Sequence, residues 1–177
     1  RFEENLIDLF RPALLERAQR DFPKRTPAPE GSGVGSLVFH PDPKRPGRAF
    51  VHIYNAVTPY SIFADPRYIR SCLLEGLDFI EREFDLKVIG THTWLNSYPK
   101  WLSYFPEEYR DNFLPPNQEV AIGDQFWGQF VNARGCFNEK HGAVMRQTGN
   151  FPFATRYSHC SIGRLRQYLE ESPCGTR

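Results

Sequence analysis

The segment 91–97 combines several polar side chains, among them a histidine and an asparagine. Its position predicts that His92 lies at the carboxyl end of a strand, where the ligands of open α/β sheets collect. An imidazole can take or give a proton near neutral pH. We therefore expect His92 to be a proton-transfer group and Asn96 to be a catalytic partner that orients substrate. The alternative is a histidine that only forms a hydrogen bond within a loop.

Three amide side chains lie in a second aromatic segment, which we expect to be a helix over about 124–134 that ends at Gly135. Amides are costly to bury without partners, so they either face solvent or bind a ligand. If they bind a ligand, Gln129 is a third catalytic candidate that stabilises developing negative charge, whereas Gln125 and Asn132 bind substrate.

Aromatic residues are concentrated in the segment 94–105, which follows neither a helical nor a strand period. Aromatic side chains on irregular loops often line ligand pockets, so we expect Trp94, Trp101 and Trp127 to shape an apolar pocket. Arg146 is the candidate anchor for an anionic group of the substrate, although it could simply pair with an acidic helix face. The aromatic segment could equally form a homodimer interface.

A metal site is the main alternative to cofactor-free chemistry. The histidines that could converge on iron or zinc are His52, His92, His141 and His159. None of them has the close spacing of HExxH, and the cysteines form no CxxC pair, so the expectation is that no cofactor is bound.

Other catalytic motifs are weak or absent. Cys160 follows a histidine directly, and adjacent side chains usually point apart, which disfavours a thiol nucleophile. No GxSxG motif is present. The glycines of the segment 31–35 lead into a predicted strand rather than a helix, so they do not predict a phosphate-binding turn.

Composition excludes several classes of partner. Lys and Arg number 22 against 21 Asp and Glu, and a net charge of +1 provides no long-range attraction for nucleic acid or an anionic membrane. Local basic clusters, such as Lys44, Arg45 and Arg48, are interpreted as solvated surface. No apolar run approaches the roughly 20 residues that span a bilayer.

The four cysteines lack a disulfide framework, and no signal peptide is visible, so we expect a cytoplasmic protein. Because the chain starts at Arg1, removal of a targeting segment stays open.

The clearest element is a helix that begins at Pro66, with Asp65 as its N-cap and an apolar stripe from Ile69 to Phe84. Strands are expected at 48–55 and 87–93 on either side of it, which makes a βαβ unit with parallel strands. The other predicted elements are a helix at 2–20, a loop at 23–35, a strand at 36–39, a short helix at 107–113, a strand within 145–157, a helix at 161–170 and a flexible tail from 172.

These elements predict a single α+β (or α/β) domain over 1–177. It has a small mixed sheet with one βαβ unit, packed by N-terminal, central and C-terminal helices. The expected function is an enzyme of the isomerase/cyclase, lyase or hydrolase type, which uses acid–base catalysis on an apolar or aromatic small molecule with a polar or anionic group. Two alternatives stay open: a histidine-ligated metal enzyme, and a non-catalytic ligand-binding or protein-interaction module.

Overall fold

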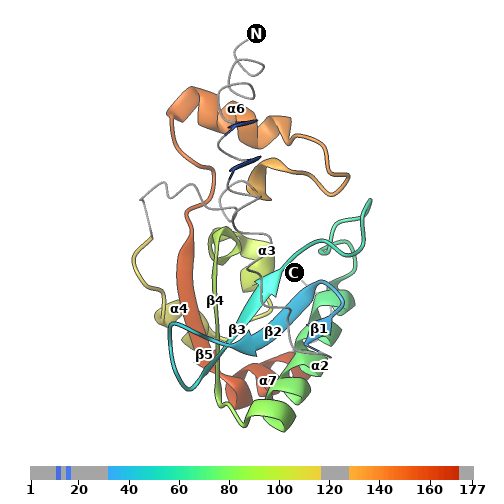
Figure 1. Ribbon diagram of the computed structural model, residues 1–177, viewed down its shortest axis with the longest axis vertical. Helices are drawn as coiled ribbons and strands as arrows, with labels where there is room; N and C mark the ends of the chain where they lie inside the picture. The colour runs from blue at the N-terminus through green and yellow to red at the C-terminus, as the bar shows by residue number, and fades with distance from the viewer. Residues whose placement is uncertain (1–10, 13–14, 17–31, 117–127, 172–177) are drawn as a thin grey trace.

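The computed structural model describes residues 11–12, 15–16, 32–116 and 128–171, and the remaining residues are drawn as a thin grey trace (Figure 1). The predicted helix at 2–20, most of the predicted loop at 23–35 and the tail from 172 therefore lie largely or wholly outside the described residues. Within the described part of the chain, no helix is both long enough and apolar enough to span a membrane.

The described residues form a mixed α+β fold around one sheet (Figure 1). Its five strands lie side by side in chain order. They are β1 (Gly33–Val34), β2 (Leu37–Pro41), β3 (Arg48–Ile53), β4 (Val88–Thr93) and β5 (Arg156–Ser161). The pairing of β3 with β4 is parallel and the other three pairings are antiparallel. The predicted fold class, with its small mixed sheet, is confirmed.

The parallel pair is joined through α2 (Pro66–Phe84), which confirms the βαβ unit. Asp65 caps this helix by accepting a hydrogen bond from the Arg67 amide at 2.9 Å, and Pro66 supplies the fixed φ that suits a first helical position. The apolar stripe packs onto the sheet. A Cβ on Gly76 would lie 2.0 Å from the Phe39 ring, so this glycine allows α2 to approach β2 closely.

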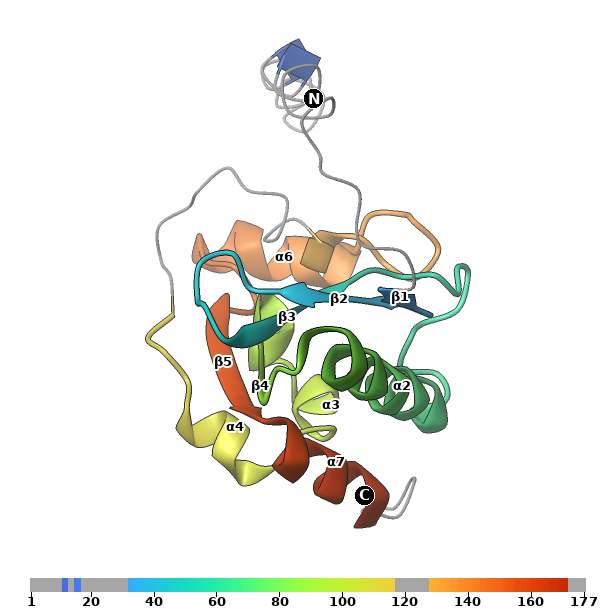
Figure 2. The ribbon, with the colours of Figure 1, turned by 60° about the horizontal axis from the view of Figure 1, so that its bottom comes forward.

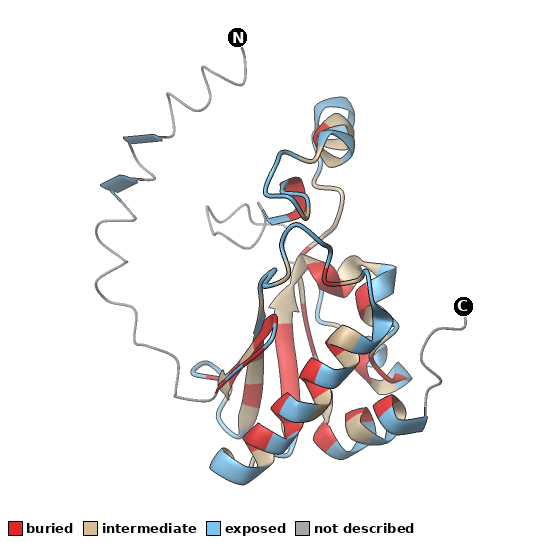
Figure 3. Ribbon diagram, turned by 90° about the vertical axis from the view of Figure 1, so that its right-hand side faces the viewer, coloured by how far each residue is buried: buried red, intermediate tan, exposed pale blue. Residues whose placement is uncertain are grey.

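The hydrophobic core lies between the sheet and one layer of helices (Figures 2 and 3). Besides α2, this layer contains α3 (Pro99–Leu102), α4 (Glu107–Asp111) and α7 (Ile162–Glu171). Alternate strand residues point into the core, including Phe39, Val51, Ile89 and Cys160. The intervening residues form the opposite side of the sheet, which we call the outer face. It includes His40, Arg48, Phe50, His52, Gly90, His92, Tyr157 and His159.

Two predicted elements in the last third of the chain are wrong. The predicted strand within 145–157 begins in helix, because α6 (Glu139–Thr148) is capped by Asn138 and ends at Gly149 with a φ of 69°. Residues 149–154 are neither helix nor strand. Only the last residues of the predicted strand join β5. The described part of the predicted helix at 124–134 is a 3-10 turn, η3 (Gly128–Phe130), followed by a hairpin that pairs Val131 with Phe137.

Candidate active site

A cavity of about 600 Å³ lies beside the carboxyl ends of the parallel strands. Its described lining comes from β3 and the residues that follow it, from the end of β4 with the 3-10 turn η2 (Trp94–Ser97), and from segments within 61–63 and 128–141. Because β3 and β4 are parallel, the two chain segments that leave them start at the same edge of the sheet. The cavity therefore lies at the edge of the sheet where the ligands of open α/β sheets collect.

Aromatic rings form one wall of this cavity. Trp94, Tyr98 and Phe63 line it, and Tyr98 packs against Phe63 with ring centroids 5.4 Å apart. Phe153 supports the wall from behind, stacked on Trp94 at 5.8 Å and in edge contact with Tyr98 at 5.5 Å. Offset and edge contacts of this kind hold rings in fixed positions, so the wall is preformed.

His92 lies on the outer face at the end of β4, half-buried, and lines the cavity. Burial lowers the pKa of His92, and the positive charges of Arg45 and Lys44 lower it further. The imidazole is therefore neutral at pH 7 and can accept a proton. Among the described residues, none forms a hydrogen bond with its ring.

His141 reaches the same cavity from the first turn of α6. Its Nδ1 lies 2.6 Å from the backbone carbonyl oxygen of Gln129. A carbonyl oxygen only accepts, so Nδ1 carries the hydrogen and a neutral ring keeps its lone pair on Nε2. The edge of the ring meets Phe153 at 5.4 Å, which fixes its orientation.

A third histidine, His52, also lines the cavity and is stacked on His40 at 4.8 Å. The described residues that line the cavity include these three imidazoles and no carboxylate, lysine or arginine. His159, the fourth member of the predicted metal set, lines a different cavity. In the described part of the chain, no three His, Cys, Asp or Glu side chains are arranged to hold a metal ion.

Asn96 does not face the cavity, which corrects its predicted catalytic role. It is 1% exposed, and its Oδ1 accepts hydrogen bonds from Trp101 Nε1 at 3.0 Å and Tyr109 Oη at 2.9 Å. Its Nδ2 donates to the backbone carbonyls of Thr91 and Arg156. All of its polar atoms are occupied, so Asn96 joins η2 to the sheet instead of orienting a substrate.

Trp101 is also misassigned as a pocket residue. Its side chain is fully buried in the core, with its ring tilted against that of Phe105 at a centroid distance of 4.9 Å, and its indole N–H donates to Asn96 Oδ1. The turn that η2 and α3 make after β4 directs Trp94 toward the cavity and Trp101 into the core. Neighbouring tryptophans in one aromatic segment therefore have different environments.

The predicted amides have structural partners. Gln129 lines the cavity, but its Nε2 donates to the Phe153 carbonyl and its Oε1 accepts from the Phe153 amide, so it positions that ring. Asn132 also lines the cavity, while its Oδ1 accepts from the amides of Arg134 and Cys136 within the hairpin. Gln125 and Trp127 lie outside the described residues.

Arg146 and Cys160 fit the structural alternatives considered for them and not the functional roles. Arg146 projects from α6, lies 3.5 Å from Glu139 and is not among the residues that line the cavity. Cys160 is fully buried on β5, and burial raises the pKa of its thiol. A buried thiol of this kind is not a nucleophile at neutral pH.

His141 is a cavity residue that the sequence predicted only as a metal ligand and not as a proton-transfer group. Asn138, three residues earlier, is a typical helix N-cap, and its side chain accepts a hydrogen bond from the His141 amide. This capping pattern could have predicted a helix start with a histidine in its first turn. The convergence of that turn with His92 could not be predicted, since the two lie 49 positions apart in the sequence.

Comparison with family models, curated proteins and solved structures gave no match to this chain. A mixed α+β sheet supports many unrelated activities, so the fold does not define the function. The functional argument therefore depends on the chemistry of the cavity.

Proposed function

We propose that this chain is an enzyme that moves protons on a small molecule bound in the cavity of His92 and His141. The observation that supports this most directly is that two half-buried imidazoles line one preformed aromatic hollow. His92 has a lowered pKa, and His141 has a defined hydrogen position. Groups with these properties in a cleft are typical of acid–base sites.

His92 acts as the base. A neutral imidazole has a lone pair, and the absence of a hydrogen-bond partner among the described residues leaves this lone pair available to a substrate. It takes a proton from one atom of the substrate and becomes an imidazolium.

His141 supplies the second proton-transfer atom, Nε2. His141 delivers a proton in its imidazolium form: Nδ1–H stays on the Gln129 carbonyl, and the Nε2 proton passes to the substrate. Solvent then reprotonates Nε2 and takes the proton that His92 removed, which restores both rings. Proton removal at one atom and proton delivery at another isomerises a substrate, and delivery to a leaving group eliminates it. An isomerase/cyclase or lyase reaction therefore suits this pair better than a hydrolase reaction.

The cavity favours a flat, largely apolar substrate. The rings of Trp94, Tyr98 and Phe63 offer stacking surfaces, and the described lining holds no permanently charged side chain. The part of the substrate inside the cavity is therefore uncharged, apart from the polar group that exchanges a proton.

The test is deuterium exchange in D₂O. Purified protein is incubated with a library of small aromatic and alicyclic carbonyl compounds, and mass spectrometry detects deuterium incorporation or a changed product. We expect exchange with the wild type and a loss of about a hundredfold or more in H92A, because general acid–base catalysis typically contributes about 10²–10⁴-fold. The H141A variant should lose activity to a similar extent.

The matched control is H40A. His40 lies on the same face of the sheet but does not line the cavity, so H40A should retain wild-type exchange. If compounds bind but none exchanges deuterium or changes in mass or retention, the site is a non-catalytic binding pocket. Equal loss in H40A and H92A would show that the loss reflects folding and would refute the proposed roles.

The cytoplasm is the proposed compartment. Cys72, Cys136 and Cys160 are free thiols, as a reducing environment would maintain them. No cofactor is included in the proposal, and its partner is a small molecule.

A further inference from the structure

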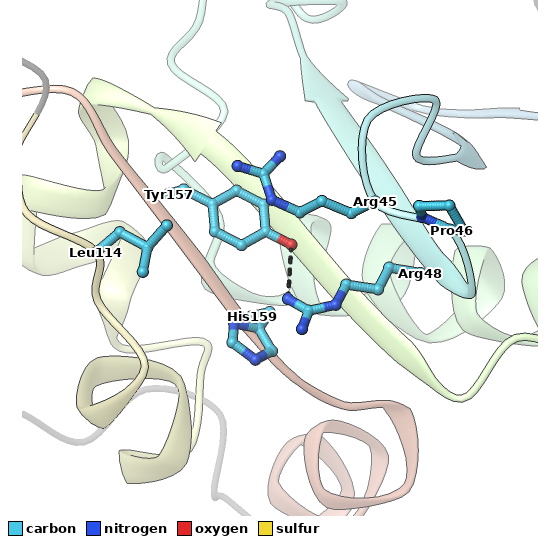
Figure 4. A pocket seen from close by; sticks show the side chains of 6 residues that line it. All are labelled: Arg45, Pro46, Arg48, Leu114, Tyr157 and His159. Atoms are coloured by element: carbon cyan, nitrogen blue, oxygen red, sulfur yellow. Dashed lines mark hydrogen bonds between the residues drawn. The ribbon is translucent and has the colours of Figure 1, made fainter.

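A second cavity, of about 430 Å³, lies on the outer face near the opposite end of β4 and is lined by a separate set of residues. Arg48 projects from β3, and Tyr157 and His159 project from β5 (Figure 4). Arg45 and Pro46 belong to the turn between β2 and β3, and Leu114 follows α4. No described residue lines both this cavity and that of His92.

The ring of Tyr157 forms the floor of this second cavity. It extends across β4 over Gly90, where a Cβ would lie 2.5 Å from the tyrosine oxygen. The guanidinium carbon of Arg45 is 3.7 Å from the ring centroid, and Arg48 Nη1 lies 3.4 Å from Tyr157 Oη (Figure 4). The phenol ring therefore brings the two guanidinium groups together.

The cavity is electropositive. Its lining contains two arginines and no carboxylate among the described residues. Asp42 lies 3.4 Å from Arg45 and balances one charge, whereas Arg48 makes no ion pair within the described part of the chain. Two guanidinium groups with only one carboxylate beside them leave one positive charge unbalanced, which a bound anion can neutralise.

His159 adds an unsatisfied polar group. Its ring stacks near Tyr157 with centroids 5.8 Å apart, and its Nδ1 is buried without a hydrogen-bond partner among the described residues. Burial and the charges of Arg48 and Arg45 lower the pKa of His159, although Glu108 on α4 opposes this shift. The neutral ring has one N–H to donate, and buried polar groups normally have partners.

We propose that Arg45, Arg48 and His159 bind a phosphate group, either as the free ion or as part of a monoester. Each arginine has five N–H donors, and only one of each is engaged in the contacts with Asp42 and Tyr157. Donors from three side chains match the three or four oxygens of a tetrahedral phosphate better than the two of a carboxylate. The cavity exceeds the size of the ion, which leaves room for the rest of an ester.

The test is calorimetric titration of the full chain with inorganic phosphate at low ionic strength. We expect saturable binding that is weakened about tenfold or more in R45Q and in R48Q, because each removes charge-assisted hydrogen bonds. The matched control is R164Q, which removes an exposed arginine on α7 and should leave binding unchanged. Acetate should bind much more weakly than phosphate.

A second titration with phenyl phosphate distinguishes the sources of the group. If phenyl phosphate binds more tightly than inorganic phosphate, the group belongs to an ester; if it binds equally or more weakly, the ligand is the free ion. In either case the R48Q variant must bind the ligand more weakly than the wild type does. NMR adds a readout on the wild type, since phosphate should shift the imidazole signals of His159 and not those of His40. The proposal is overturned if phosphate does not bind at millimolar concentrations, or binds R45Q and R48Q as it binds the wild type. Because the two cavities are separate, binding should persist in H92A whether or not that variant loses turnover.

Discussion

Tyr157 is paired directly with His92 across β5 and β4, and its ring extends from that pair over Gly90 to Arg48. One tyrosine therefore connects the histidine of the first cavity with the arginines of the second. The connection is also electrostatic, because the Arg45 guanidinium above the same ring lowers the pKa of both His92 and His159.

The first prediction concerns the titration of these histidines. NMR should give pKa values for His92 and His159 below the usual value of about 6.5. Because the Arg45 charge contributes to both shifts, R45Q should raise both pKa values, while R164Q leaves them unchanged. A pKa of 6.5 or higher for His92 in the wild type would contradict its proposed role as a neutral base.

The same shifts predict how stability depends on pH. Both imidazoles have folded-state pKa values below those of the unfolded chain, so the unfolded chain binds more protons between the two values. The free energy of unfolding should therefore fall as pH decreases from about 7 through 6.5 toward the folded-state pKa values. Urea denaturation across this range measures the effect, and H92Q should show a smaller slope with pH than the wild type.

The close approach of Tyr157 to β4 predicts a strong effect at Gly90. A Cβ there would lie 2.5 Å from the Tyr157 oxygen and 2.8 Å from the Ser158 carbonyl oxygen. The Ser158 carbonyl belongs to the backbone of β5, so it cannot move away easily. G90A should lower the free energy of unfolding by about 1–3 kcal/mol. The control is G163A on α7, where a Cβ meets nothing within 4 Å and the helix should be unaffected or slightly stabilised. Equal stability of the two variants would refute the tight packing at Gly90.

The buried network of Asn96 predicts a structural effect of its removal. N96A leaves the Trp101 N–H in the core without its acceptor and removes one acceptor shared by Tyr109 and Thr91, which should lower the free energy of unfolding by about 3 kcal/mol in chemical denaturation. The exposed Asn150 serves as the control, with an expected change within about 0.5 kcal/mol for N150A. A fully stable N96A would mean that Asn96 is not the support described above.

Thiol reactivity should separate the cysteines. Cys136 is exposed in the hairpin, whereas Cys72 and Cys160 are buried and the pKa of Cys160 is raised by burial. Iodoacetamide followed by peptide mapping should label Cys136 in the native protein and label Cys160 only after unfolding in guanidinium. Rapid labelling of native Cys160 would contradict its inert, buried state.

Sequence-local patterns determined the βαβ unit. Asp65, Pro66 and the apolar stripe of α2 involve residues within a few turns of one another, so their spacing alone predicts the helix. The same holds for α7. Where short polar elements follow one another, as in α6 and the hairpin before it, the pattern is weak and the predicted strand and helix were wrong.

Only the tertiary structure decided which side chains meet. The sequence predicted that His92 ends a strand. It did not predict that His141 lines the same cavity or that the charge of Arg45 acts on His92, because both residues are distant from His92 in the sequence. The antiparallel pairing of β5 with β4 is also a long-range contact. The direction of the turn after β4 buried Asn96 and Trp101 while Trp94 reached the cavity. Similarly, Arg45 and Arg48 were predicted to be solvated surface, whereas in the structure both contact Tyr157. Long-range pairing and the handedness of a turn leave no periodic trace in a single sequence, which is the physical reason that the elements could be predicted better than the sites.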